Sequence, residues 1–447
     1  MELERKIEGQ EARVCVMGLG YVGLPLAVEF ARLGFRVIGL DPNEQRVASI
    51  QRGESYIQDV SSADVAEVTR TGLLAATSDP EILKEMDVIF ICVPTPFTKT
   101  KTPDLSYVVA ASEEIAQRLR PGQLIILQST TYPGTTEEDV LPILESSGLK
   151  AGGDFHLAFS PERVNPGDRR YDVTNTPKVV GGVSPRCAEL AQLVLQKLMP
   201  EVHIVSSPRA AEMTKLLENI FRSVNIALIN ELAKLSERMG IDIWEVIEAA
   251  STKPFGFMPF YPGPGVGGHC VPVDPYYLFW KSREYDFYPR FIELAAELNQ
   301  GMPYHVLSKI SEALNSRGKT LQQAKVLILG VSFKPDVDDA RNAPAQRVIE
   351  LLLSGGARVS YNDPYIDHFS VGKDVFYPEE QTLTSTPLTE ELLRSQDCVV
   401  IVAGHRAYDY QWIVDQAPTV VDTMNATRGV KSKGGMIFKV GAPSPRP

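Results

Sequence analysis

The segment Arg13-Val-Cys-Val-Met17-Gly18-Leu-Gly20-Tyr-Val-Gly23 is a short apolar run that leads directly into three closely spaced glycines. The apolar run predicts a buried β-strand, and residues 24–33 have apolar side chains at helical spacing before a glycine at position 34. Residues 36–41, Arg-Val-Ile-Gly-Leu-Asp, predict a second strand. Together the three elements form a βαβ unit, the building block of a dinucleotide-binding fold.

Each glycine of this turn has a physical role. Gly18 permits the tight turn, Gly20 lets a pyrophosphate approach the backbone, and Gly23 lets helix and strand pack closely. Asp41 ends the second strand, where a carboxylate binds the adenosine ribose and repels a 2′-phosphate, so NAD is favoured over NADP. The alternative is a structural βα turn of an unrelated α/β protein. Arg46 either reaches the adenosine side of the cofactor or is a solvated helix charge.

The rest of the chain continues this alternation of strands and helices. Apolar runs at 88–92 and 124–127, with a helical segment at 105–119 between them, predict a doubly wound parallel sheet. Residues 210–239 contain no glycine or proline and predict one helix about 45 Å long. After a stretch rich in proline, glycine and aromatic residues, a second helical pattern covers 290–298.

The opening pattern then returns near the C-terminus. Lys325-Val-Leu-Ile-Leu-Gly330 repeats the first strand and its glycine, residues 345–353 repeat the helix, and Arg358-Val-Ser-Tyr-Asn-Asp363 repeats the strand that ends in aspartate. Asp397-Cys-Val-Val-Ile-Val402 resembles the strand at 88–92. We therefore predict an α/β fold of two Rossmann-like doubly wound domains joined by a helical central domain with a long helix. The second domain lacks the glycine fingerprint and is expected to hold something other than a dinucleotide.

Composition narrows the class of protein. A chain of 447 residues predicts two or three domains, and a net charge of −11 argues against nucleic-acid binding. No apolar run is long enough to span a bilayer, and the charged N-terminus lacks the core of a signal peptide. The five cysteines are scattered without a CxxC pair, so neither disulfides nor a metal site is expected, and a cytoplasmic location is predicted.

A second informative stretch is Gly265-Val-Gly-Gly-His-Cys270-Val-Pro-Val-Asp274. A cysteine in such a loop is either an activated nucleophile or a buried, inert thiol. Together with a nicotinamide cofactor, a nucleophilic Cys270 suggests an aldehyde-level intermediate held as a covalent adduct. Lys215 and Asn219 lie four residues apart on the long predicted helix and share one face, although spacing alone favours a solvated lysine for Lys215.

Seven motifs occur together and in order: Gly18-Leu-Gly-Tyr-Val-Gly23, Val93-Pro-Thr-Pro96, Ser129-Thr-Thr-Tyr-Pro-Gly134, Ser160-Pro-Glu-Arg-Val-Asn-Pro-Gly167, Lys215-Leu-Leu-Glu-Asn219, Gly267-Gly-His-Cys-Val-Pro-Val-Asp274 and Phe333-Lys-Pro-Asp-Val-Asp-Asp-Ala-Arg341. On these motifs nearly the whole chain resembles the UDP-glucose/GDP-mannose dehydrogenase family. It is most similar to the branch that oxidises UDP-N-acetylhexosamines.

The resemblance implies two successive hydride transfers to NAD⁺ without release of the aldehyde. Cys270 would form a thiohemiacetal and then a thioester. Lys215 and Asp274 would manage the proton of the substrate alcohol, and Asn219 would add a neutral donor. Glu162 would be the base in thioester hydrolysis; its alternative is a loop carboxylate paired with Arg163.

Further contacts follow from the same resemblance. Thr130 would lie near the nicotinamide; its alternative role is a strand cap. Lys334 would contact the UDP portion of the substrate, and Arg341 would reach the NAD pyrophosphate. The alternative for both Lys334 and Arg341 is a surface ion pair. The expected cofactor contacts are Gly18, Gly20, Tyr21, Val22, Gly23, Asp41, Arg46, Thr95, Ser129, Thr130 and Arg341. The expected substrate contacts are Glu162, Arg163, Val164, Lys215, Asn219, Phe260, Tyr261, Gly267, Arg290 and Lys334, of which Arg290 would come from a second subunit.

The expected substrate is UDP-N-acetyl-D-glucosamine, oxidised at C6, with the D-mannosamine epimer and UDP-glucose as alternatives. A one-hydride dehydrogenase and a catalytically silent binding module also remain open. Met424 stands where the branch often has arginine, which puts one charged substrate contact in doubt. The expected domains are an NAD-binding domain at 1–205, a helical dimerisation domain with the cysteine loop at 206–312, and a UDP-sugar-binding domain at 313–447. A homodimer is expected, without nucleic-acid or membrane partners.

Overall fold

The computed structural model describes residues 2–57, 59–98, 101–164, 171–268, 271–373 and 377–445. The chain forms two compact units. The first comprises Met1–Glu218 and Tyr276–Phe287, and the second comprises Asn219–Pro275 and Tyr288–Pro447. Among the described residues, none of the helices has the length and apolar character needed to cross a bilayer.

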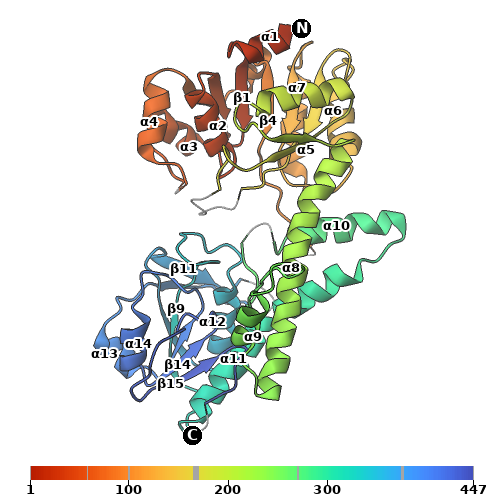
Figure 1. Ribbon diagram of the computed structural model, residues 1–447. Helices are drawn as coiled ribbons and strands as arrows, with labels where there is room; N and C mark the ends of the chain where they lie inside the picture. The colour runs from red at the N-terminus through yellow and green to blue at the C-terminus, as the bar shows by residue number, and fades with distance from the viewer. Residues whose placement is uncertain are drawn as a thin grey trace. The chain divides into compact units, whose positions relative to one another are not determined.

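The first unit is built on one twisted sheet of eight strands in the order β3-β2-β1-β4-β5-β6-β7-β8 (Figure 1). The strands are β1 (Arg13–Met17), β2 (Arg36–Leu40), β3 (Leu74–Thr77), β4 (Val88–Ile91), β5 (Leu124–Leu127), β6 (His156–Phe159), β7 (Lys178–Gly182) and β8 (Val202–Ile204). Strands β1 to β6 are parallel, and β7 runs antiparallel to β6. The strand order reverses between β1 and β4, the position at which such sheets bind ligands.

Helices cover both faces of this sheet. The helices of this unit are α1 (Glu2–Glu8), α2 (Gly23–Arg32), α3 (Glu44–Gln51), α4 (Ser62–Arg70), α5 (Ser106–Ala116), α6 (Leu141–Glu145), α7 (Pro185–Leu195), the first part of α8 (Pro208–Met239) and most of α10 (Asp274–Ser282), with short helical turns at Pro80–Glu85, Thr135–Val140 and Arg283–Tyr285. One core packs α1, α2, α4 and α7 on one face, and a second core packs α5 and α6 on the other. Alternate residues of each strand therefore enter opposite cores, as a doubly wound sheet requires.

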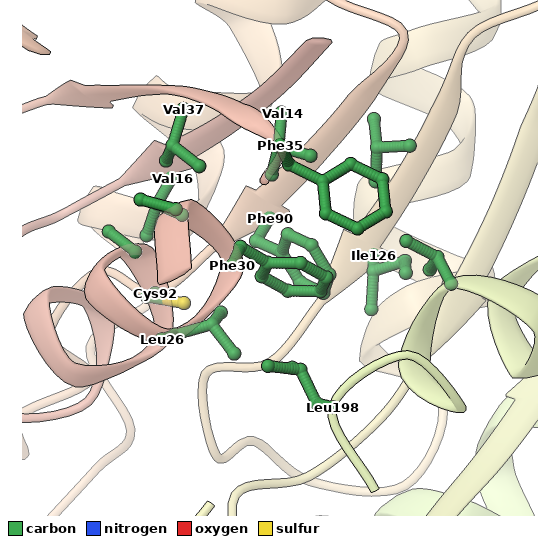
Figure 2. Close-up of a cluster of buried hydrophobic side chains, with 14 of the residues drawn as sticks. Val14, Val16, Leu26, Phe30, Phe35, Val37, Phe90, Cys92, Ile126 and Leu198 are labelled. Carbon is green, nitrogen blue, oxygen red and sulfur yellow. The ribbon is translucent and has the colours of Figure 1, made fainter. Parts of the chain in front are cut away.

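The core beneath α2 shows why the first βαβ unit forms. Phe30 of α2 packs edge-on against Phe35 and lies 5.3 Å, centroid to centroid, from Phe90 of β4 (Figure 2). These three rings are fully buried. The apolar face of α2 thus fixes the helix, and with it the preceding glycine turn, against the sheet.

The second unit contains a five-stranded parallel sheet in the order β10-β9-β13-β14-β15, and a separate antiparallel pair, β11 and β12. Its strands are β9 (Lys325–Leu329), β10 (Arg358–Asn362), β11 (His368–Val371), β12 (Gln381–Thr384), β13 (Cys398–Ile401), β14 (Thr419–Asp422) and β15 (Met436–Lys439). Its helices are the rest of α8, α9 (Ile243–Ala250), α11 (Arg290–Asn315), α12 (Pro344–Ser354), α13 (Glu390–Ser395) and α14 (Tyr410–Gln416). Helices α11 and α12 cover one face of the sheet, and α13 and α14 cover the other.

The predicted fold class is confirmed: two Rossmann-like sheets and a helical central region containing a long helix. Helix α8 spans 32 residues (green in Figure 1), close to the predicted 210–239. Helix α11 runs far beyond the predicted end at 298 and continues through Gly301 and Pro303. Proline disfavours a helix interior, but Met302, Val306 and Ile310 are fully buried in the second unit's core, and this burial keeps the helix continuous. The three domain boundaries stay a prediction.

Candidate functional site

The glycine turn has the geometry that a bound dinucleotide requires. Gly18 has a positive φ of 89°, and a Cβ there would lie 2.6 Å from the carbonyl oxygen of Cys92. A Cβ on Gly23 would lie 1.9 Å from the carbonyl oxygen of Gly18, whereas a Cβ on Gly20 would meet nothing within 4 Å. Two glycines therefore close the turn, and the third leaves open space over the backbone beside the N-terminus of α2, where a pyrophosphate fits.

Asp41 lies next to this turn and helps to hold it. Its carboxylate is 3% exposed and accepts hydrogen bonds from the backbone N–H groups of Leu19 (2.8 Å) and Asn43 (2.9 Å). The guanidinium of Arg46 lies 3.2 Å from the same carboxylate and stacks over the ring of Tyr56. Arg46 thus lies beside the carboxylate expected to bind ribose. Tyr21 and Val22 are half-buried in the turn itself. Their cofactor contacts stay predictions.

The ends of β4 and β5 carry the other residues expected near the cofactor. The Ser129 hydroxyl donates to the carbonyl oxygens of Val93 (2.7 Å) and Ile91 (3.2 Å), so it ties the two strand ends together. Thr130 follows and is half-buried. The Thr95 carbonyl oxygen accepts a hydrogen bond from Tyr277 of α10.

Glu162 lies just after β6 in the first unit and is closely surrounded by donors. Its Oε1 accepts from the backbone N–H groups of Arg163 (2.8 Å) and Val164 (2.9 Å). Its Oε2 accepts from the Gln128 side-chain amide (2.8 Å) and lies 3.4 Å from Nζ of Lys178. The donors fix both oxygens of this carboxylate.

The Arg163 guanidinium does not pair with Glu162. It forms an ion pair with Glu218 (2.7 Å) and donates to the carbonyl oxygen of Pro177 (2.6 Å). Arg163 therefore contributes only its backbone N–H to the Glu162 carboxylate, and the alternative that treated the two side chains as a loop ion pair is wrong.

The charges around Glu162 keep it ionised. Burial raises its pKa, but the positive charge of Lys178, the two backbone N–H donors and the charge of Lys215 outweigh burial and hold the pKa below its ordinary value. Lys215 is 8% exposed, so it is not a solvated helix lysine. Gln128 and Lys178 were not among the residues expected from the sequence. The one available signal was a lysine at the head of the apolar run Lys178-Val-Val-Gly-Gly182.

In the second unit, Asn219 of α8 meets Asp274 at the start of α10. The Asn219 side-chain amide donates to the Asp274 carboxylate at 2.5 Å, and the two side chains are 6% and 2% exposed. Residues 55 apart in the chain thus form a buried amide–carboxylate pair.

The loop before Cys270 packs against the loop that carries Lys334. A Cβ on Gly267 would lie 2.8 Å from Cβ of Phe333, so only glycine fits there. The Gly268 N–H donates to the Arg341 carbonyl oxygen (3.1 Å), and the Asn342 amide donates to the Gly268 carbonyl oxygen (3.1 Å). One backbone hydrogen bond and one from the Asn342 side chain therefore join segments that are far apart in the sequence.

Lys334 and Arg341 are differently placed. Nζ of Lys334 lies 5.8 Å from the centroid of the Phe333 ring. The Arg341 guanidinium forms a two-point ion pair with Asp339, with its side chain about half exposed. The Arg341 guanidinium is thus paired with Asp339. Its contact with the cofactor pyrophosphate stays a prediction.

Two aromatic residues of the loop before Gly263 pack on helices of the second unit. Phe260 lies edge-on to Phe221 at 5.6 Å, and Tyr261 stacks on Trp244 at 5.9 Å. These contacts anchor the loop. Arg290 is exposed at the start of α11.

Met424 stands where the related enzymes often have an arginine that contacts the substrate, so its surroundings are relevant to that contact. The sulfur of Met424 lies 3.4 Å from the position of a Cβ on Gly263, and nearby Arg428 is paired with Glu248 at 3.0 Å. Arg428 therefore forms an exposed ion pair with α9. His269 and Cys270 lie outside the described residues, so the role expected of Cys270 stays a prediction. Within the described part of the chain, no three His, Cys, Asp or Glu side chains cluster as metal ligands.

Comparison with known proteins agrees with this geometry. Three models of the UDP-glucose/GDP-mannose dehydrogenase family match: its NAD binding domain at residues 12–199, its central domain at 209–301 and its UDP binding domain at 327–429. UDP-N-acetyl-D-glucosamine 6-dehydrogenase of Pseudomonas aeruginosa is 41% identical over 359 residues, which is 80% of this chain and 84% of that protein. UDP-N-acetyl-D-mannosamine dehydrogenase of Methanococcus maripaludis is 35% identical over 89% of this chain and 87% of that one.

A solved structure shows the same fold. The UDP-D-ManNAc dehydrogenase of Pyrococcus horikoshii superposes with a TM-score of 0.86 at 33% identity, covering 96% of this chain and 99% of that one.

The glycine turn fits a dinucleotide, and together with the matching NAD binding and UDP binding domain models it defines an NAD-dependent nucleotide-sugar dehydrogenase. The chain belongs to the UDP-glucose/GDP-mannose dehydrogenase family. NAD is its cofactor, and its substrate is a nucleotide sugar.

Proposed function

We propose that this protein oxidises the C6 hydroxyl of UDP-N-acetyl-D-glucosamine to the carboxylate in two NAD-dependent steps. The observation that carries the proposal is Glu162 at the carboxyl end of the NAD-binding sheet, a carboxylate whose side chain is 12% exposed and whose pKa is held below its ordinary value. A simple alcohol dehydrogenase needs no group to activate water. An enzyme that oxidises the alcohol to the acid needs a group that activates water for hydrolysis of the thioester. An ionised carboxylate is suited to take a proton from that water.

The overall reaction consumes one water and two NAD⁺ and releases two NADH and three protons. When bound at the glycine turn beside Asp41, NAD⁺ would supply the hydride acceptor for both oxidations at C6. In the first oxidation, Lys215 and Asp274 handle the proton that leaves the substrate hydroxyl. The thiolate of Cys270 then adds to the aldehyde carbon and gives a thiohemiacetal, whose oxygen an ammonium such as that of Lys215 stabilises.

Loss of the second hydride converts the thiohemiacetal into a thioester. Water attacks its carbonyl carbon while Glu162 takes the water proton, and the carbon–sulfur bond breaks so that Cys270 leaves as the thiolate. The Asn219 amide orients Asp274 through their buried hydrogen bond. Asp41, Arg46 and the glycine turn hold the adenosine and pyrophosphate parts of the cofactor.

The choice of sugar rests on relatives and on two motifs. A relative named for UDP-N-acetyl-D-glucosamine is 41% identical, and one named for the D-mannosamine epimer is 35% identical. The motifs Lys215-Leu-Leu-Glu-Asn-Ile-Phe-Arg222 and Lys253-Pro-Phe-Gly-Phe-Met-Pro-Phe-Tyr261 favour the gluco form. The D-mannosamine epimer is the second candidate, and UDP-glucose the third.

The proposal includes a homodimer and a cytoplasmic location. An apolar stripe of the second unit supports the dimer, because Leu228, Leu235 and Met239 of α8 are 48%, 50% and 62% exposed. The location rests on the cysteines: the four described ones are unpaired, as expected in a reducing compartment.

The decisive measurement is the NADH formed at completion with limiting UDP-GlcNAc, UDP-ManNAc and UDP-glucose in parallel. Two NADH per molecule of UDP-GlcNAc, with turnover abolished in Cys270→Ser, is the expected result. One NADH per molecule would indicate a one-hydride dehydrogenase. Binding of nucleotide sugar without NADH would indicate a silent binding module. Cys187→Ser, at a buried thiol of α7, is the matched control and should keep the yield of two.

A further inference from the structure

Lys178, the first residue of β7, is a buried lysine beside the proposed water-activating base. It is 2% exposed, and its Nζ lies 3.4 Å from Oε2 of Glu162. Its backbone N–H donates to the carbonyl oxygen of Glu201 (2.9 Å), so the chain itself is held in place. Burying an ammonium is costly unless an opposite charge compensates for it, and the Glu162 carboxylate does so.

The sheet topology brings this pair together. Strand β7 is antiparallel to β6, with Ala158 opposite Gly182 and Phe159 opposite Gly181. Continuing that register beyond the paired residues puts Glu162 directly opposite Lys178. In a wholly parallel sheet the first residue of β7 would lie at the far edge, so the reversal of one strand delivers a positive charge to the ligand-binding edge.

We propose that Lys178 is a positioning residue for thioester hydrolysis: its ammonium, together with the Gln128 amide, holds Glu162 in one orientation and in its carboxylate form. This inference rests on the proposed function, because it concerns the step in which Glu162 takes the proton of the attacking water. Lys178 itself touches neither water nor substrate in this scheme. It acts through Glu162.

The other neighbours of Glu162 do not duplicate the role of Lys178. Lys215 of α8 is the other charged side chain that affects the Glu162 pKa, and it is already assigned to the substrate hydroxyl. The thiol of Cys92, directly after β4, donates to the side-chain oxygen of Gln128 (3.7 Å). Burial raises the pKa of this thiol, so the thiol stays uncharged. Arg163 offers only its backbone N–H. Without Lys178, the Glu162 carboxylate, which is 12% exposed, loses one of the two ammonium groups that compensate its charge.

The test combines rapid-mixing measurement of NADH with the pH dependence of kcat in Lys178→Met, a neutral side chain of similar length. We expect the first-turnover formation of NADH to be unchanged, steady-state kcat to fall about 10- to 100-fold, and the acidic limb of the kcat profile to move to higher pH. Lys178→Arg, which keeps the charge, should restore the position of the limb. Lys150→Met is the matched control, since Lys150 forms an exposed ion pair with Glu145, and it should change none of these values.

Two outcomes with Lys178→Met would overturn the proposal. In the first, the acidic limb of the kcat profile stays in place while thermal stability falls, which indicates a purely structural lysine. In the second, the first-turnover formation of NADH is lost. Glu162→Gln, measured in parallel, separates this from failure of the proposed function. It should still form NADH in the first turnover but not turn over. Wild-type turnover in Glu162→Gln would refute the role of Glu162 itself, whatever Lys178→Met does.

Discussion

Asp363 is the counterpart of Asp41 in the second sheet, and the two carboxylates do the same structural work. Asp41 accepts the N–H of Leu19, and Asp363 accepts the N–H of Val331 at 2.7 Å. They differ in their other partners. Asp41 lies beside the half-exposed Arg46, whereas Asp363 is enclosed by His405, which is fully buried with Nε2 3.0 Å from the carboxylate. A carboxylate enclosed in this way is not available to a ribose, which agrees with a second domain that holds a ligand other than a dinucleotide.

The tautomer of His405 follows from its neighbours. Its Nδ1 accepts the backbone N–H of Asp336 (2.9 Å), so the proton is on Nε2, which donates to Asp363. The Ser332 hydroxyl lies 3.4 Å from the same Nε2 and donates to the Lys334 carbonyl oxygen. The cluster therefore holds the loop that carries Lys334, and it does not have the arrangement of a Ser-His-Asp relay, which needs both imidazole nitrogens.

Replacing Asp363 with alanine should destabilise the protein by about 3 kcal/mol, because the N–H groups of Val331 and Ser332 and the imidazole of His405 would be buried without an acceptor. Urea denaturation of the variant and the wild type measures the difference. Asp415→Ala, at an exposed ion pair with Lys433, is the control and should change stability by less than about 0.5 kcal/mol.

The same variant has a defined pH dependence. Burial raises the pKa of Asp363, but the hydrogen bonds from His405 and from the backbone outweigh burial, so its folded-state pKa is lowered. A lowered pKa means stabilisation that is full above the unfolded value of about 4 and lost as pH falls through the folded value. The stability gap between wild type and Asp363→Ala should therefore be constant near neutral pH and shrink below about pH 4. A gap that widens on acidification would contradict this account.

Among the elements, the loop from Gly263 to Gly268 contains one position, Gly267, that leaves no room for a side chain. A Cβ on Gly267 would come within 3.0 Å of Phe333, Pro344 and Asn342. Because the loop leads directly to Cys270, any displacement at Gly267 moves the predicted nucleophile. Small misplacements of a reacting group are costly to the rate.

We expect Gly267→Ala to lower kcat about 100-fold while leaving NAD affinity unchanged, because the clash lies in the second unit and the glycine turn in the first. Steady-state kinetics and NAD titration by fluorescence measure the two effects. Gly301→Ala is the matched control: a Cβ there meets nothing within 4 Å, and the position is inside α11. It should keep full activity and stabilise the protein by up to about 1 kcal/mol. Equal loss of activity in both variants would remove the steric explanation.

At the scale of the whole molecule, the stripe on α8 predicts the oligomeric state. Leu228, Leu232, Leu235 and Met239 recur at helical spacing and are 48%, 37%, 50% and 62% exposed. A contiguous apolar stripe of this kind is usually covered by another protein surface. A second copy of the chain is the proposed cover.

Light scattering of the wild type should give twice the chain mass of 49.3 kDa. The double variant Leu228→Glu/Leu235→Glu should give the mass of one chain, because two charges would be buried in the interface. Tyr107→Glu is the control, since Tyr107 is 51% exposed on α5 and belongs to the first unit, and it should leave the mass unchanged. A monomeric wild type would refute the dimer.

The amino-acid sequence was sufficient for the βαβ unit, the glycine turn with Asp41, the long helix and the repeat of the opening pattern. These features depend on local periodicity and on residues whose backbone freedom is intrinsic, such as Gly18. The continuation of α11 through Pro303 could not be predicted, because burial of its neighbours outweighs the local preference of proline.

The partners of the functional carboxylates depend on the folded chain. The alternative considered for Glu162 was an ion pair with Arg163, its neighbour in sequence, yet its side-chain partners are Gln128 of the preceding strand end and Lys178 of a reversed strand. The pairing of Asp363 with His405 likewise joins residues 42 apart. Strand order and strand direction determine these contacts, and both are set by how the whole sheet buries its apolar faces, a property that no short stretch of sequence carries.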